Sequence, residues 1–218
     1  SDSGSCENVA IGFFGALTGP NANLGVNIRN GVELAVEQFN EENDDCQVSL
    51  EEYDSQGLPE QATGLATEAA GDENVIGIVG PAFSGESDAA GPTFAEAGLP
   101  TITASATNPD LSGNGWDTFH RALGNDADQG PAAAAYISDV LGSENVFVVD
   151  DATAYGAGLA EIVVESLGEA VAGTDTIQTG QTDFSATVTS IRSSGADAVF
   201  FGGYYPEGGL LVQQLRGA

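Results

Sequence analysis

Apolar residues follow two alternating patterns along this chain. Short runs rich in β-forming residues predict strands at residues 8–14, 47–53, 75–79, 100–103, 117–121, 145–149, 171–177 and 197–201. In the segments between them, helical periodicity predicts helices at residues 25–40, 59–71, 85–97, 127–141, 156–168, 183–194 and 207–216. Runs such as "NVFVVD" are continuously apolar, as expected of parallel strands covered on both faces. These patterns predict an α/β fold with doubly wound parallel sheets and right-handed crossovers.

The alternation stops between residues 104 and 126, where turn residues and one strand occur without a helix. We interpret this stretch as a crossing between two lobes. The predicted N-terminal lobe spans residues 1–123, and the predicted second lobe spans residues 124–218. Only three strand–helix units fall after residue 144, so we expect the second lobe to be incomplete in this chain.

The charge of the chain is extreme and narrows the possible environments and partners. There are 33 acidic residues against four basic ones, and the formal net charge is −29. Self-repulsion of this size destabilises a compact chain in dilute buffer, whereas molar salt shortens the Debye length to about 3 Å and screens it. The composition therefore resembles that of proteins from extreme halophiles. Four arginines cannot form a basic patch, which argues against a nucleic-acid partner.

Both cysteines stand just before predicted strands. Cys6 precedes the strand at 8–14, and Cys46 precedes the strand at 47–53. If those strands are parallel neighbours, the two thiols lie at the same edge of the sheet. We favour a disulfide over two free thiols, and a disulfide implies an oxidising compartment. The polar start "SDSGSCEN" is typical of a mature secreted chain or a tether. We therefore expect an extracellular or cell-surface protein, tethered to the membrane through its N-terminus.

The stretch "VGPAFSGES", residues 79–87, places Ser84 in a small-residue turn between a predicted strand and a predicted helix. A catalytic nucleophile would need the pattern G-x-S-x-G, of which only half is present. The only histidine, His120, lies in a predicted strand, where a structural role is favoured.

Phosphate and metal sites are also disfavoured. The stretch "GFFGALTG" matches neither phosphate-binding glycine pattern. The adjacent Asp150 and Asp151 lack the histidine or cysteine spacing of a metal site, and a role as solvated capping residues fits them better. Ser84 is left as a hydroxyl at a helix N-terminus, where it either acts as a simple N-cap or binds a carboxylate. A zwitterion with no net charge fits an acidic protein better than a phosphate does.

Five motifs occur in order from about Val9 to the last residue: "GALTGP", "NPDLS" after "ASAT", "DADQGPAAAAYI", "YGAGLA" and "GGYYPE". Together they resemble the leucine/isoleucine/valine-binding family of type I solute-binding proteins, which serve ABC transporters. The resemblance implies a type I periplasmic-binding-protein-like fold, in which two lobes close on a ligand cleft. It also implies a monomeric, non-enzymatic binding protein without cofactor or metal. Its expected ligand is a free amino acid with a branched-chain or other apolar side chain, and its expected partners are the membrane subunits of an ABC importer.

The resemblance also assigns ligand-binding roles to individual residues. Ser84 and Thr107 match the positions that bind the α-carboxylate of the ligand, and Ser105 matches a position whose backbone carbonyl receives the α-ammonium. Tyr155 and Tyr204 match aromatic residues that the second lobe contributes.

Two further positions bear on the side chain of the ligand. Leu24 stands where leucine-type binders have a tyrosine, so Leu24 and Phe83 leave the pocket size open. The acid that pairs with the ammonium in the family falls beyond residue 218, which implies a truncated chain. A ligand-sensing receptor domain of the same fold, or an α/β hydrolase, remains an alternative function.

Overall fold

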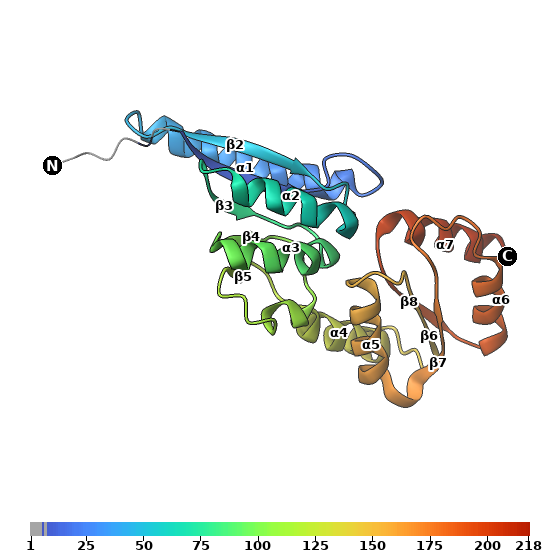
Figure 1. The fold of residues 1–218 in the computed structure, drawn as a ribbon. Coiled ribbons are helices and arrows are strands. Elements are labelled where there is room, and N and C mark those ends of the chain that lie inside the picture. The colour runs from blue at the N-terminus through green and yellow to red at the C-terminus, as the bar shows by residue number, and fades with distance from the viewer. Residues whose placement is uncertain (1–5, 7) are drawn as a thin grey trace. The chain divides into compact units, whose positions relative to one another are not determined.

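The structure is a computed structural model that describes residue 6 and residues 8–218. Its strands are β1 (Val9–Gly15), β2 (Val48–Asp54), β3 (Val75–Val79), β4 (Thr101–Thr103), β5 (Phe119–Arg121), β6 (Val146–Asp150), β7 (Val171–Thr176) and β8 (Ala198–Gly202) (Figure 1). Its α-helices are α1 (Ala22–Glu42), α2 (Pro59–Gly71), α3 (Ser84–Ala97), α4 (Asp126–Ala135), α5 (Gly156–Leu167), α6 (Ser185–Ser194) and α7 (Tyr205–Gly217). Every predicted strand and helix overlaps one of these elements, and the predicted α/β class is confirmed.

Contacts divide the chain into two compact units. Unit 1 extends to Ala106 and includes Asp110–Leu123. Unit 2 comprises Thr107–Pro109 and Gly124–Ala218. The short segment Thr107–Pro109 thus groups with the second unit, although the chain returns to the first unit after it.

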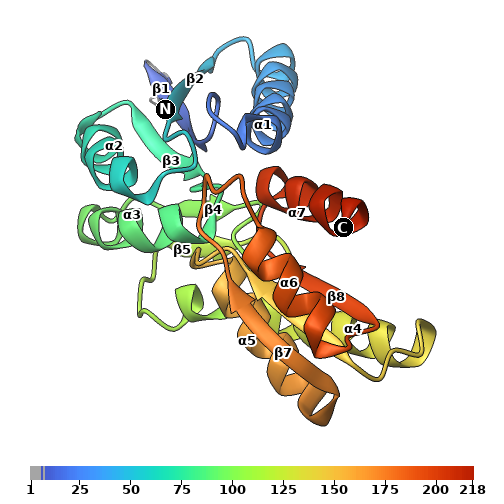
Figure 2. The same ribbon diagram turned by 90° about the vertical axis from the view of Figure 1, so that its right-hand side faces the viewer.

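Unit 1 is built on one sheet of five parallel strands in the order β2-β1-β3-β4-β5. One face carries the main apolar core, in which alanines of α2 and α3 let both helices lie close to the strands. Phe14 of β1 stands at its centre, with its ring 6.2 Å from that of Tyr53 and 5.8 Å from that of Phe94. Helix α1 lies on the opposite side of β1 and β2 from α2 (Figure 2).

The face of this sheet that carries α1 is only partly covered. An open apolar groove of about 750 Å³ runs between α1 and the strands, lined by residues such as Ile28, Val32 and Ile76. Ile76 of β3 is 56% exposed and Ile102 of β4 is 42% exposed. The expectation of strands covered on both faces is therefore not met within unit 1 at these two side chains of β3 and β4.

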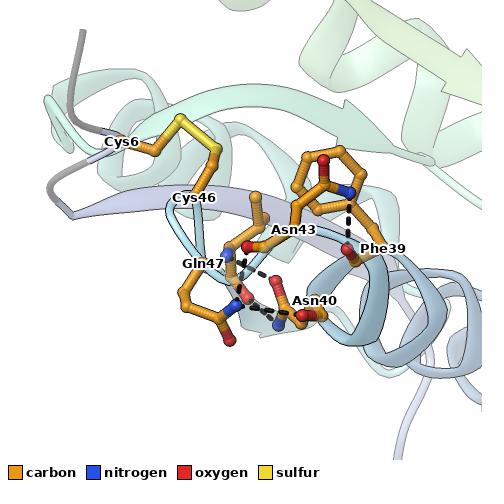
Figure 3. Close-up of a disulfide and its surroundings, with 7 residues drawn as sticks. Cys6, Phe39, Asn40, Asn43, Cys46 and Gln47 are labelled. Carbon is orange, nitrogen blue, oxygen red and sulfur yellow. Dashed lines mark hydrogen bonds between the residues drawn. A yellow bond between two sulfur atoms is a disulfide. The ribbon is translucent and has the colours of Figure 1, made fainter. Parts of the chain in front are cut away.

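The predicted disulfide is confirmed. Cys6 and Cys46 are bonded, with their Cα atoms 4.8 Å apart, at the edge of the sheet where β1 and β2 begin (Figure 3). The adjoining turn from α1 into β2 is held by Asn40, whose side chain exchanges two hydrogen bonds with the backbone of Val48, at 2.8 and 2.9 Å. Gln47 adds bonds to the carbonyls at the end of the helix. The covalent link thus ties the start of β1 to the start of β2, and these bonds hold the start of β2 against the end of α1.

Unit 2 holds three parallel strands in the order β7-β6-β8, with helices on both faces. Helices α4 and α5 cover one face, and α6 and α7 cover the other. The four apolar residues of β6, Val146–Val149, are all buried, so the prediction from "NVFVVD" is confirmed for this strand. The predicted helix at 127–141 differs in detail. It starts after Asn125, whose side chain accepts the N–H of Ala127, and continues beyond Ala135 as a π-helical turn.

Two properties of the described residues bear on the class of protein. No helix in this part of the chain combines the length and apolar character needed to cross a membrane. Nor do residues 6 and 8–218 contain a group of three or more histidine, cysteine or acidic side chains able to hold a metal ion.

Candidate functional site

The loops that matter for binding follow the carboxyl ends of the strands. All strands within each sheet are parallel, so these loops gather at one edge of each sheet, opposite the edge that carries the disulfide in unit 1. This edge is where open α/β sheets bind ligands. In unit 1 it carries Phe83, Ser84 and Ser105, and in unit 2 it carries Tyr155 and Tyr204.

Ser84 is the first residue of α3 and is almost fully buried, with 1% of its surface exposed. The N–H groups of a first helical turn have no partner within the helix, and the helix dipole adds positive potential there. Phe83 immediately before it is also buried, and its ring packs beside Gly57. The loop between β3 and α3 thus offers a hydroxyl, backbone donors and an aromatic ring.

A buried carboxyl group, Glu86, holds this loop in place. Glu86 is completely buried and accepts the hydroxyl of Ser55 and, at 3.0 Å, the N–H of Phe83. Burial raises the pKa of Glu86 to about 7, against the opposing effect of the hydrogen bonds that it accepts. One side chain therefore joins the loop after β2 to the loop after β3.

The neighbouring loops are joined in the same way. At the end of β2, the Asp54 carboxylate accepts the N–H of Leu17 at 2.8 Å and the hydroxyl of Thr18 at 2.6 Å, which fixes the "GALTGP" turn. Burial alone would raise the pKa of Asp54, but these hydrogen bonds lower it below its usual value. At the end of β4, the Thr103 hydroxyl donates to the carbonyl of Pro81 at 2.7 Å. Side chains thus link four successive loops of unit 1.

Ser105 and Leu24 occupy two of these loops. Ser105 is half-buried, and its N–H lies 3.3 Å from the Thr103 hydroxyl, so it belongs to the loop that is bonded to the Ser84 loop. Leu24 lies in the first turn of α1 and is 37% exposed. The next residue must be glycine, because a Cβ on Gly25 would lie 1.8 Å from the carbonyl oxygen of Ala16. The start of α1 therefore packs directly on the loop after β1.

In unit 2 the two tyrosines form a pair. Their ring centroids are 5.3 Å apart, with an interplanar angle of 42°. Tyr155 precedes α5 and Tyr204 precedes α7, so adjacent strands β6 and β8 bring them together. The amide of Gln129 lies 3.4 Å from the hydroxyl of Tyr155. Burial raises the pKa of Tyr155.

Thr107 groups with the tyrosines rather than with Ser84. Its backbone carbonyl accepts the N–H of Asp126 at 3.0 Å, and the side chain of Asn108 donates to the carbonyl of Ala154 at 2.8 Å. The Thr107 hydroxyl is buried and has no hydrogen-bond partner among the described residues. A buried polar group without a partner is unfavourable, so this hydroxyl is suited to bond a ligand.

Sequence reasoning missed the buried acids. Asp151 was interpreted as a solvated capping residue, but it is 1% exposed and accepts the N–H of Tyr204 at 3.0 Å. The spacing of Glu86 three positions after Phe83, at the start of a predicted helix, is the one signal that could have identified a helix-capping acid. His120 lies on strand β5 and lines an apolar hollow with Ile76 and Ile102, away from the loops.

The geometry of the two units is that of a protein that binds a small polar ligand. Each unit has a parallel sheet, and the carboxyl edges of the sheets present hydroxyl groups, helix N-termini and aromatic rings, which are groups that can hold such a ligand. A family described as "Periplasmic binding protein" matches residues 8–218. The chain belongs to this family, and the predicted type I fold and branched-chain-binder resemblance are confirmed.

Individual relatives support the assignment to this family. The chain is 38% identical to the Leu/Ile/Val-binding protein BraC3 of Rhizobium johnstonii, over 96% of this chain and 58% of that protein. It is 32% identical to the Leu/Ile/Val-binding protein of Escherichia coli, over 97% of this chain and 59% of that protein. The crystal structure of the substrate-binding protein LivJ of Streptococcus pneumoniae with isoleucine matches with a TM-score of 0.88 and 30% identity, over 97% of this chain and 61% of that one. This chain thus spans about three fifths of the length of these proteins.

Proposed function

We propose that the full-length protein is the extracellular substrate-binding protein of an ABC importer, and that it holds a free amino acid with an apolar, branched-chain side chain between its lobes. The observation that carries this proposal is the similarity to proteins named Leu/Ile/Val-binding along almost the whole chain, at 32–38% identity. A solved relative holds isoleucine. Membership of a family of periplasmic binding proteins supports a secreted protein.

The two units supply complementary groups for such a ligand. In unit 1, the Ser84 hydroxyl and the first turn of α3 suit the α-carboxylate, and the backbone carbonyl of Ser105 suits the α-ammonium. In unit 2, the buried hydroxyl of Thr107 adds a donor for the carboxylate, and the ring pair of Tyr155 and Tyr204 covers the ligand. Leu24 and Phe83 line the side-chain end of the proposed site.

The chemistry of the chain favours a zwitterion over a charged anion. The chain has 33 acidic residues and only four basic ones, so it offers few cationic side chains to pair with a phosphate or a dicarboxylate. A zwitterion carries no net charge and can still use the helix N-terminus. We propose that the membrane subunits of the importer are the partners, that the protein is monomeric, that it performs no reaction, and that its N-terminus tethers it to the membrane.

The experiment combines ligand identification with a variant. The full-length protein is purified in molar salt and then unfolded to release its bound ligand. Mass spectrometry of the released material should identify leucine, isoleucine or valine. Ser84→Ala should weaken binding of the released ligand about 10- to 150-fold, because a hydrogen bond to a charged group is worth about 1.5–3 kcal/mol. The matched control is Ser166→Ala, because this exposed hydroxyl donates to the carbonyl of Ile162 within α5. Equal affinity of the Ser84 and Ser166 variants would show that Ser84 does not bind the ligand. Release of a ligand without an amino group would contradict the proposed function.

A further inference from the structure

Asp151 is a buried carboxylate at the carboxyl end of β6 that the proposed ligand contacts do not use. Its described donors are neutral groups. The Oδ1 atom accepts the N–H of Thr153 at 3.0 Å and the hydroxyl of Thr153 at 2.6 Å, and Oδ2 accepts the N–H of Tyr204 at 3.0 Å. A buried charge is costly unless it is hydrogen-bonded, so these donors and the carboxylate hold one another in place.

The carboxylate belongs to a chain of hydrogen bonds between the two tyrosines. The Thr153 hydroxyl that donates to Asp151 also accepts the N–H of Gly156, the first residue of α5, at 2.9 Å. Tyr155 stands immediately before this helix. The backbone of Tyr204 is therefore connected, through Asp151 and Thr153, to the helix start that carries the other ring.

Three glycines make room for this arrangement. A Cβ on Gly156 would lie 2.2 Å from Oδ1 of Asp151, and a Cβ on Gly203 would lie 2.5 Å from Oδ2. A Cβ on Gly202 would lie 2.6 Å from the carbonyl oxygen of Gly156. Such separations are far below van der Waals contact, so only glycine fits at these positions. The carboxylate thus explains Gly156 of "YGAGLA" and Gly203 of "GGYYPE", and the carbonyl of Gly156 explains Gly202.

We propose that Asp151 is a positioning residue, which sets the spacing and orientation of the Tyr155–Tyr204 pair without touching the ligand. The inference rests on the proposed function, in which these two rings contact the amino acid. Rings held in place before binding lose little freedom when the ligand arrives, which favours affinity. Loss of the link should therefore weaken binding even when the unit stays folded.

The test uses Asp151→Asn in the full-length protein. The substitution keeps the size of the side chain but replaces one acceptor oxygen by an amide group that cannot accept from Tyr204 or Thr153. We expect the affinity for isoleucine to fall about 10-fold, the effect of one charge-assisted hydrogen bond. The matched control is Asp150→Asn, since Asp150 is the adjacent residue and bonds the Thr176 hydroxyl at 2.8 Å instead. The control should bind isoleucine within about twofold of the wild type, and equal losses in both variants would overturn the proposal.

A double-mutant cycle separates positioning from a general structural role. Tyr155→Ala and Tyr204→Ala together remove both rings but keep the backbone N–H of Tyr204. In that background Asp151→Asn should cause little further loss of affinity, whereas a full additional loss would contradict action through the rings. If Asp151→Asn does not fold, Thr153→Val and Thr153→Ser take its place. Only the valine variant lacks the linking hydroxyl, so equal affinities for these two variants would contradict the proposal.

The proposal can also fail independently of the proposed function. If the wild-type protein binds no amino acid, the proposed function is wrong. Crystal structures of the wild type and Asp151→Asn then decide the positioning role. It predicts that the ring centroids of Tyr155 and Tyr204 move away from their 5.3 Å separation in the variant, and an unchanged ring pair would refute it.

Discussion

Replacement of Glu86 by glutamine should change how the stability of unit 1 depends on pH. Glu86 is completely buried, and burial raises its pKa from an ordinary value of 4.5 to about 7. Between these two values the folded protein retains the proton that the unfolded chain has lost. Stability contributed by this group is therefore complete below about pH 4.5, falls as the pH rises, and levels off above about pH 7.

The size of the effect follows from the two pKa values. The difference between the unfolded and folded pKa values of Glu86 corresponds to a loss of roughly 3 kcal/mol in the free energy of unfolding as the pH rises through both values. About 2.5 kcal/mol of this loss falls between pH 5 and pH 8. Glutamine does not titrate, and its amide can still accept the N–H of Phe83 and donate to the Ser55 hydroxyl. The free energy of unfolding of the wild type should thus fall by about 2.5 kcal/mol relative to Glu86→Gln when the pH is raised from 5 to 8.

The chain offers a specific reporter for this measurement. Trp116 is the only tryptophan, and its ring packs against Gly91 of α3, the helix that carries Glu86. Urea unfolding in molar salt, followed by tryptophan fluorescence, therefore reports on unit 1. The other acidic residues are common to both proteins, so their contributions cancel in the difference. A difference that stays constant from pH 5 to pH 8, or one that favours the wild type at high pH, would refute the reasoning.

Three further predictions concern stability. Free-thiol titration of the unfolded, unreduced protein should find no thiols, and two reactive thiols would contradict the disulfide. Cys46→Ser should lower the free energy of unfolding by about 4 kcal/mol on the chain-entropy model for a loop of 40 residues. Circular dichroism across a salt titration should show loss of the fold in dilute buffer, and a cooperative native signal there would contradict the halophile interpretation. Gly25→Ala should destabilise unit 1 by about 3 kcal/mol or more, because its Cβ would meet the carbonyl of Ala16 at 1.8 Å. The control Gly31→Ala, where nothing lies within 4 Å, should instead stabilise unit 1 by up to about 1 kcal/mol, because alanine is the better helix former.

The sequence predicted the elements well because their signals are local. Continuous apolar runs marked the strands, and the two cysteines preceded neighbouring parallel strands, so their pairing followed from topology. The family resemblance identified Tyr155 and Tyr204, and the structure adds that their rings form a pair. Whether the pair contacts a ligand remains a prediction.

The buried acids could not be predicted, for a physical reason. Glu86 and Asp151 are two of 33 acidic residues, and each looks locally like a solvated helix-capping residue. They become buried only when loops from different strands converge on them. Likewise, the apolar pattern of β3 and β4 cannot reveal that Ile76 and Ile102 are exposed, since the covering layer is not encoded in the strands themselves.

The central claim, that the full-length protein binds a free apolar amino acid, is tested most directly by calorimetry in molar salt with isoleucine and with 3-methylpentanoate. The second compound has the same carbon skeleton and carboxylate as isoleucine but lacks the amino group. We expect isoleucine to bind with one molecule per protein and 3-methylpentanoate to bind at least about 10-fold more weakly, because the groups that meet the ammonium then lose their partner. Equal binding of both compounds, or binding of 3-methylpentanoate alone, would contradict the account.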